Sequence, residues 1–510
     1  MKKIPLPSIN SIIILSILVI SLGFGSTNLI AIAETGEILY EDPNWYFNGN
    51  AAGTKMGSSV SGVGDVNGDG KPDVLVGAEL YQGTQEKEGA TFLFLGSGGS
   101  LSTVPDWHFF GGQKGSHLGC ALTGLGDINK DGVDDIAISA CEYNIEEDGE
   151  VKKSKVGAVY VFHGSNSITL STQPDWTFFG DQIEAYLGSS VSSARDINQD
   201  GYMDMLIGAP LYDTLNELGE PIFTNNGRVF LFLGSSEGFS DVPDWTADGF
   251  FNAEKFGSSV TTADVDGDGY PDVIVGAPRP TNKGSVYVYE SDAGVLSNVP
   301  KVLPHSQTGS QFGFSVEGVG YVNDDLYEDV VIGAPDYKKV IDLTPVSFGC
   351  VYFYDGSPTG LAESPSREIC GQVPNGKLGA SLAKAGDMDN DGFDDFLVGS
   401  PDFSEIVNEP GEEQQGAVFL FFGASKISSP AHIRTDVDSV FGGKADTDFG
   451  ISVSSIGDVN GDNQLDIIIG APDFKVGGIR PGSAMVYFAG IPGIPVYDYD
   501  FSIFLPVVQK

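Results

Sequence analysis

The feature that most constrains this chain is a nine-residue acidic loop that recurs along it. One copy reads DVDGDGYPD, from Asp264 to Asp272. Side-chain oxygens stand at its first, third, fifth and ninth places, and Gly269 permits a sharp turn that directs the carbonyl of Tyr270 inward. Calcium binds roughly six to eight oxygen ligands, which carboxylates, a carbonyl and water can supply from a loop this short. The loop therefore predicts a calcium site.

The flanks of this loop distinguish it from an EF-hand. An EF-hand carries a glutamate at its twelfth place and lies between two helices. Here the twelfth residue is Val275, inside the run VIVGAP, whose β-branched residues are typical of a strand. We therefore expect the loop to join two strands.

The same pattern returns at six further places. Five copies are intact: DVNGDGKPD from Asp65, DINKDGVDD from Asp127, DINQDGYMD from Asp196, DMDNDGFDD from Asp387 and DVNGDNQLD from Asp458. The sixth, YVNDDLYED from Tyr321 to Asp329, is damaged, because Tyr321 replaces the first ligand and Leu326 replaces the turn glycine. We expect about six calcium sites and a weak or empty one at Tyr321. The predicted ligands, including the seventh-place residues that offer a backbone carbonyl, are Asp65, Asn67, Asp69, Lys71, Asp73, Asp127, Asn129, Asp131, Val133, Asp135, Asp196, Asn198, Asp200, Tyr202, Asp204, Asp264, Asp266, Asp268, Tyr270, Asp272, Asp387, Asp389, Asp391, Phe393, Asp395, Asp458, Asn460, Asp462, Gln464 and Asp466.

Each loop lies within a longer repeated unit. A unit contains an FG-like step and a strand, the acidic loop, a second strand ending in GAP, a variable connection, a glycine-led third strand, and a fourth strand with PDW or a relic of it. Four-stranded units that cannot bury both faces alone stack radially. The sequence therefore predicts an all-β fold, a seven-bladed β-propeller of four-stranded antiparallel blades. We interpret the FG and GAP residues as packing residues, with no catalytic role.

The last unit lacks a PDW strand, and the missing piece stands at the other end of the chain. The segment PNWYFNG, from Pro43 to Gly49, matches PDWHFFG from Pro105 and PDWTFFG from Pro174. The four tryptophans all occupy this strand position: Trp45, Trp107, Trp176 and Trp245. We expect the N-terminal strand to complete the last blade and so to remove its open edges.

The N-terminus has the pattern of an export signal. Two lysines precede an apolar run from Ile12 to Phe24, and Ala31-Ile32-Ala33 forms a cleavage site. We expect a signal peptide at 1–33, the propeller at 34–490 and a tail at 491–510, with a retained anchor as the alternative reading of the first segment. No segment of the mature chain has the length and apolarity to span a bilayer. The protein is expected to be secreted, extracellular or at the cell surface.

The ordered series FG, DxNGDG, GAP and GxVYVF resembles the FG-GAP repeat family, best known from the head of integrin α subunits. The resemblance covers about Pro43 to Gly490. It implies a calcium-binding propeller that acts in adhesion or binds a macromolecule. The chain ends where the leg domains of integrin α would begin and has no inserted von Willebrand-type domain. A full integrin heterodimer is therefore not expected.

Two other functions stay open. FG-GAP repeats also occur in a phospholipase D that cleaves glycosylphosphatidylinositol anchors, so a secreted hydrolase is one alternative, and a structural cell-envelope protein is another. We expect no enzyme, because the sequence shows no H-E-x-x-H motif and no G-x-S-x-G elbow that precedes a helix, and the calcium loops supply their own ligands. The formal charge of -43 argues against nucleic acid or an anionic membrane as partner.

An aromatic residue recurs four residues after the GAP-type small residue, with Pro280 as the exception. The six are Tyr81, Tyr143, Tyr212, Tyr337, Phe403 and Phe474. Connections in an antiparallel blade alternate between its ends, so these residues are expected on the face opposite the calcium loops, where variable connections would meet a protein or a cell-surface polymer. In integrin α heads, aromatics on this face cage a basic side chain of the partner subunit. The resemblance thus suggests a cation-accepting ring around the channel, and the alternative is that each ring supports its own loop.

The four cysteines are expected to form two disulfides, Cys120 with Cys141 and Cys350 with Cys370. Each pair lies at facing ends of adjacent strands, and export makes oxidation plausible. Free buried thiols are the alternative.

Overall fold

The computed structural model describes residues 43–166, 170–279, 281–341, 343–404, 415–423 and 447–488, and the backbone of 439–442. The predicted signal peptide and tail lie outside these ranges. The ordered elements within them are β-strands, and no helix there is long and apolar enough to cross a membrane.

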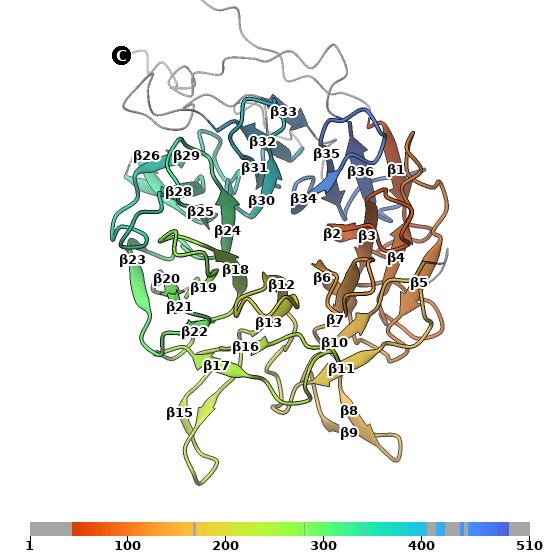
Figure 1. The fold of residues 1–510 in the computed structure, drawn as a ribbon, viewed down its shortest axis with the longest axis horizontal. Coiled ribbons are helices and arrows are strands. Elements are labelled where there is room, and N and C mark those ends of the chain that lie inside the picture. Colours follow the sequence, from red (N-terminus) through yellow and green to blue (C-terminus); the bar gives the residue numbers. More distant parts are fainter. Residues whose placement is uncertain are drawn as a thin grey trace, which may run out of the picture. The chain divides into compact units, whose positions relative to one another are not determined.

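Seven four-stranded antiparallel sheets follow one another along the chain, which confirms the predicted propeller (Figure 1). The first three blades contain β2 (Met56–Gly64), β3 (Asp73–Ala78), β4 (Ala90–Phe94) and β5 (Trp107–Phe110); β6 (Leu118–Gly126), β7 (Asp135–Ala140), β10 (Ala158–Phe162) and β11 (Trp176–Phe179); and β12 (Ser190–Arg195), β13 (Asp204–Ala209), β16 (Arg228–Phe232) and β17 (Trp245–Asp248). Blades four and five contain β18 (Ser259–Ala263), β19 (Asp272–Ala277), β20 (Lys283–Tyr289) and β23 (Lys301–Thr308); and β24 (Ser315–Gly320), β25 (Asp329–Ala334), β28 (Cys350–Tyr354) and β29 (Arg367–Cys370). Blades six and seven contain β30 (Ser381–Gly386), β31 (Asp395–Ser400), β32 (Ala417–Phe421) and β33 (Ser439–Gly442); and β34 (Ser452–Gly457), β35 (Asp466–Ala471), β36 (Ser483–Tyr487) and β1 (Trp45–Asn48).

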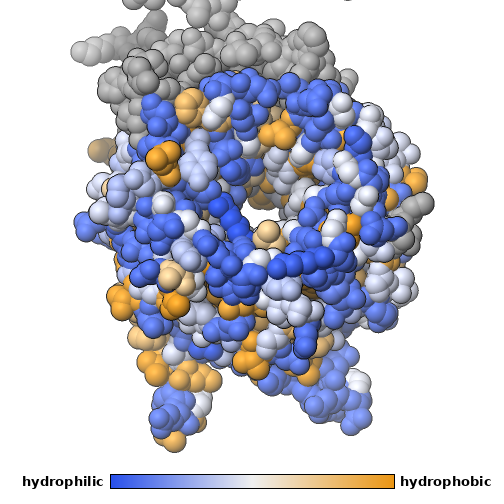
Figure 2. Space-filling view, in the orientation of Figure 1, coloured by the Kyte–Doolittle hydropathy of each residue, from blue (hydrophilic) through white to orange (hydrophobic). Residues whose placement is uncertain are grey.

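Four small hairpins extend from the connections between blade strands. They are β8 (Ile145–Glu147) with β9 (Glu150–Lys153), β14 (Thr214–Leu215) with β15 (Pro221–Phe223), β21 (Ser291–Asp292) with β22 (Val295–Leu296), and β26 (Lys338–Ile341) with β27 (Thr344–Ser347). Three of them lie between the second and third strands of a blade, where the sequence shows its variable connections. The view in Figure 2 shows a largely hydrophilic surface around a central opening.

The ring closes through the pairing of the first strand with the last. In this pairing β1 lies antiparallel to β36, with Trp45 opposite Val486 and Asn48 opposite Ser483. The predicted closure by the N-terminal strand is therefore confirmed.

The FG and GAP glycines mark the places where neighbouring blades approach most closely. A Cβ atom at Gly276, in the GAP motif of blade four, would collide with the carbonyl oxygen of Gly313, in the FG step of blade five. Gly313 itself has a φ of 85°, which a larger residue rarely adopts. These motifs therefore serve packing, as the sequence indicates.

The tryptophans join the blades at their outer strands. The indole Nε1 of Trp45 donates to the carbonyl of Ser102, and that of Trp107 donates to the carbonyl of Ser171, both at 2.9 Å. Each acceptor belongs to the following blade. Trp176 makes the equivalent bond to Ser240 at 3.3 Å, so three of the four tryptophans bridge two blades through a hydrogen bond.

Candidate metal centres

The acidic loop of blade four connects β18 to β19 and turns tightly on its own side chains. The two carboxylate oxygens of Asp264 accept the amides of Gly267 at 2.8 Å and Gly269 at 3.0 Å. Gly269 has a φ of 92°, as the predicted turn requires. Carboxylate oxygens of Asp264, Asp266 and Asp268 lie within 4.8 Å of one another. Three ligands predicted from the sequence therefore converge here.

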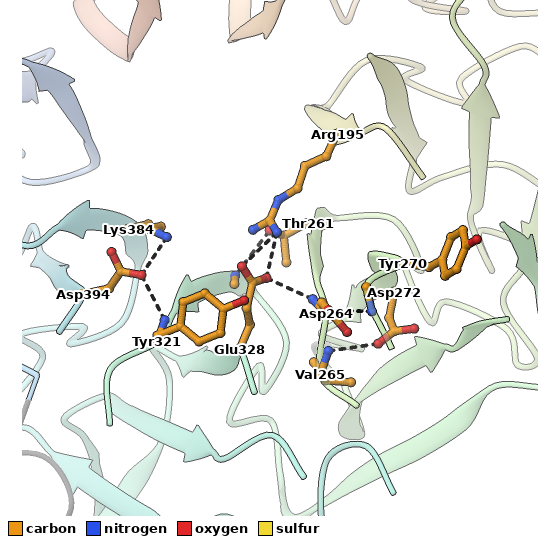
Figure 3. Close-up of polar contacts among 12 residues, drawn as sticks. Arg195, Thr261, Asp264, Val265, Tyr270, Asp272, Tyr321, Glu328, Lys384 and Asp394 are labelled. Carbon is orange, nitrogen blue, oxygen red and sulfur yellow. Dashed lines mark hydrogen bonds and ion pairs between the residues drawn. The ribbon is translucent and has the colours of Figure 1, made fainter. Parts of the chain in front are cut away.

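The ninth-place aspartate ties the loop to the rest of its blade. Asp272 accepts the amide of Val265 at 3.0 Å, which Figure 3 shows, and the amide of Ser291 just after β20 at 2.8 Å. The side chain is fully buried, and this burial raises the pKa of Asp272 to about 7. A cation bound beside this carboxylate would favour its charged form.

The other intact loops repeat these bonds. In each, the amide at the sixth place donates to the first-place carboxylate: Gly70 to Asp65 at 2.6 Å, Gly132 to Asp127 at 2.9 Å, Gly201 to Asp196 at 2.7 Å, Gly392 to Asp387 at 2.9 Å and Asn463 to Asp458 at 2.8 Å. The last loop has no glycine at this place, and Asn463 takes the left-handed conformation instead, with a φ of 66°. In the loop of blade six, Asp387, Asp389 and Asp395 also bring carboxylate oxygens within 4.8 Å of one another.

The damaged loop of blade five has a different arrangement. The side-chain amide nitrogen of Asn323 donates to the ninth-place carboxylate of Asp329 at 2.8 Å, whereas the third-place asparagine of an intact loop donates to the fifth-place carboxylate, as Asn129 does to Asp131 at 2.9 Å. Leu326, at the place of the turn glycine, is exposed and is not left-handed. That the fifth loop holds a cation weakly or not at all stays a prediction.

The donor set of the intact loops fits a hard divalent cation. The side chains at the predicted ligand places offer carboxylate and amide oxygens, which calcium prefers, and no histidine or cysteine lies within the nine-residue loops. The carboxylates that converge repel one another until a cation compensates them.

A further set of carboxylates, at the eighth place, was not identified from the sequence. Asp134, Glu328 and Asp394 each accept the amide of the first residue of the preceding blade's loop, at 2.8 to 2.9 Å. Those first residues are Asp65, Asp264 and Tyr321 (Figure 3 draws the second and third contacts). The sequence feature that could have indicated these carboxylates is an acidic residue directly before the ninth-place aspartate, which three of the seven loops carry.

The six predicted ligand-face aromatics lie in the connections at the opposite ends of the blades. The backbone amide of each aromatic residue donates to the carbonyl of the second small residue of its GAP-type motif, three positions earlier, as Tyr212 does to Ala209 at 3.2 Å. This bond closes a turn. Four of the rings contact side chains on blade strands: Tyr81 stacks on Phe110, Tyr143 contacts Phe179 and Phe403 contacts Phe419 of the same blade, and Tyr337 contacts His305 of the preceding blade. Phe474 packs on a core cluster.

The Tyr212 ring is buried and in contact with a cationic side chain. It is 8% exposed, and the Arg228 guanidinium lies 4.1 Å from its ring centroid. Its face is thus already occupied by a cation of the same blade. The cation-accepting ring and its alternative, that each ring supports its own loop, both stay predictions.

Both expected disulfides are present. Cys120 of β6 is bonded to Cys141 after β7, and Cys350 of β28 is bonded to Cys370 of β29. No cysteine in the described part of the chain is free.

The repeated geometry and the comparisons agree on the class of protein. A family model for the FG-GAP repeat matches residues 56–92, 187–232, 256–289, 378–421 and 449–484. Each match begins at or just before the first strand of a blade and reaches its third. Five of the seven blades therefore match the FG-GAP repeat, and the chain is similar in sequence to integrin α subunits.

Individual relatives extend this likeness. Integrin alpha-6 of Homo sapiens is 30% identical over 233 residues, which are 45% of this chain and 19% of that protein. Integrin alpha-IIb of Mus musculus is 33% identical over 198 residues, 38% of this chain and 18% of that protein. The chain spans about a fifth of the length of the curated relatives it matches.

Proposed function

We propose that this protein is a secreted, calcium-stabilised propeller that binds a protein or a cell-surface polymer through the face opposite its acidic loops. Its likeness to integrin α subunits supports an adhesion or binding module. The observation that carries the proposal is the repeated loop, in which a first-place carboxylate holds the turn; in the loops of blades four and six, three carboxylates also lie within 4.8 Å of one another.

The role proposed for calcium is structural. In the intact loops of blades one, two, three, four and six, the ninth-place aspartate also accepts the amide of the second residue after the third strand, as Asp73 does from Gly96 at 2.8 Å and Asp395 from Gly423 at 2.9 Å. A cation held by such a loop would join the ends of three strands in one blade. Because six loops are intact, the whole ring would gain stability from calcium.

The opposite face offers a rigid, exposed apolar projection. The β14–β15 hairpin carries Leu218, which is 83% exposed, and Ile222, which is also exposed. Its base is fixed, because Asp213 and Gln182 exchange hydrogen bonds and Asn225 donates its amide to the Asp213 carboxylate at 2.6 Å. Exposed apolar residues on a fixed projection are typical of an interaction surface.

No specific observation favours the hydrolase. The ring of His305 stacks on Phe312 and hydrogen-bonds the Tyr352 hydroxyl at 2.9 Å. Such a residue is part of the packing. The structural envelope protein remains a second outcome of the binding test.

The test is capture of the purified protein on immobilised cell-surface proteins and polymers, with calcium and with chelator. Leu218→Asp should reduce the captured fraction severalfold. Val299→Asp is the matched control, since Val299 is 79% exposed but lies in a connection at the acidic-loop ends of the blades. Equal capture of the two variants would contradict the proposed face, and no capture of any form would favour the structural role.

A further inference from the structure

The eighth residue of a loop is joined to the first residue of the preceding blade's loop by two hydrogen bonds at three junctions. At the junction of blades four and five, the amide of Glu328 donates to the Asp264 carbonyl at 3.1 Å, and the Glu328 carboxylate accepts the Asp264 amide at 2.9 Å. Asp264 is the first proposed cation ligand of loop four. Its backbone is thus held by blade five, whose own loop is damaged.

A residue of blade three holds Glu328 in turn. The Nη1 atom of Arg195 donates to both carboxylate oxygens of Glu328, at 2.9 and 2.8 Å, and the Glu328 side chain is only 7% exposed (Figure 3). The pair therefore connects blade three to blade five and passes over blade four.

The position of Arg195 is unusual within the repeat. Five other blades have a glycine directly before the loop, and all five are left-handed: Gly64, Gly126, Gly320, Gly386 and Gly457. Arg195 adopts the same conformation with a φ of 58°, which is unfavourable for a residue with a Cβ atom. The ion pair offsets this cost and compensates the buried charge of Glu328.

We propose that Glu328 and Arg195 are positioning residues for the cation of loop four, so that the affinity of this site depends on blades three and five. The inference rests on the proposed calcium binding. Glu328 orients the backbone of the first ligand, and Arg195 keeps Glu328 in place. Residues that orient metal ligands from outside the coordination shell commonly change metal affinity by about tenfold or more when they are removed.

Two other junctions supply matched comparisons. Asp134 holds Asp65, the first ligand of the intact loop one, in the same way. Asp394 holds Tyr321, the first residue of the damaged loop, and is itself paired with Lys384 at 2.8 Å. Methionine already stands at the eighth place of loop three, as Met203, so the fold accepts this side chain there.

The experiment measures terbium binding through luminescence excited at tyrosine, in a Tyr202→Phe background that removes the equivalent phenol chromophore of loop three. Tyr270 then remains as the tyrosine of an intact loop.

Glu328→Met should weaken binding at this site about tenfold, whereas Asp394→Met should leave it unchanged. Glu328→Gln, which keeps an acceptor and loses the charge, should give an intermediate loss and serves if the first variant does not fold. Arg195→Gly should also weaken binding, and adding it to Glu328→Met should cause no further loss.

The outcomes separate the two proposals. Unchanged affinity in Glu328→Met and Glu328→Gln, or an equal loss in Asp394→Met, would overturn the positioning role while calcium binding itself stands. Absence of terbium and calcium binding in the parent protein would refute both.

Discussion

Trp45 lies opposite Val486 in the pairing of β1 with β36. The first described strand of the chain thus completes the last blade. The Trp45 side chain is 5% exposed, packs edge-on against Phe94 of the next blade, and donates its indole hydrogen to Ser102. One side chain thus contributes to the closure of a sheet and to the junction of two blades.

Trp45→Ala should therefore lower the free energy of unfolding by about 3 kcal/mol or more, because it leaves a cavity and breaks the bond to Ser102. Tyr46→Ala is the matched control: Tyr46 is the adjacent residue of β1 but is 60% exposed, and its loss should cost about 0.5 kcal/mol or less. Chemical denaturation of both variants is the measurement. Similar values for the two would contradict the closing role of Trp45.

The blade number, the strand order and the closure could be predicted because each depends on short motifs that recur in register. The contacts of Glu328 could not, since Arg195 lies 133 residues away and meets it only when blades three, four and five are in place. The six aromatics show a different limit. Equivalent positions predict equivalent turns, but not whether a ring such as Tyr212 points to the channel or packs on Arg228.

Tyr212→Ala should reduce stability more than binding. The ring is buried between the Arg228 guanidinium and Phe230, so its removal should cost about 3 kcal/mol and leave Arg228 without that contact. Leu218→Ala should reduce binding more than stability, because Leu218 is exposed. Thermal melting and capture of both variants are the measurements. A binding defect in Tyr212→Ala without a loss of stability would instead support the cation-accepting ring.

The calcium-free protein should become less stable as the pH rises. Burial raises the pKa of the ninth-place aspartates from 3.8 to about 7 at Asp73, Asp204 and Asp272, to about 6 at Asp135 and to about 8 at Asp395. A carboxyl with a raised pKa in the folded state stabilises the fold fully below its unfolded pKa, and this contribution is lost as pH rises through the folded pKa. Calorimetry of the calcium-free protein should give a lower Tm at about pH 8 than at about pH 5, and saturating calcium should remove most of the difference. A Tm that increases with pH in the calcium-free protein would contradict this.

The disulfides should make a separate contribution to stability. Each closes a loop of 20 or 21 residues. Closing such a loop lowers the conformational entropy of the unfolded chain, which stabilises the fold by about 3 kcal/mol. Replacing Cys350 and Cys370 together by alanine should lower stability by this order in chemical denaturation. The denatured, unreduced parent protein should show no titratable thiol; detection of four would refute both bridges.

The most direct test of a calcium-stabilised propeller is thermal unfolding with saturating calcium and with chelator, alongside a count of bound calcium by titration calorimetry. The protein should bind about six ions and melt at a clearly higher temperature with calcium, since saturation at one hundred times Kd stabilises by roughly 2.7 kcal/mol per site. Asp268→Ala, in an intact loop, should lose one ion and part of the increase, whereas Asp325→Ala, at the same place of the damaged loop, should lose none. An unchanged melting temperature, with no calcium bound, would contradict the account.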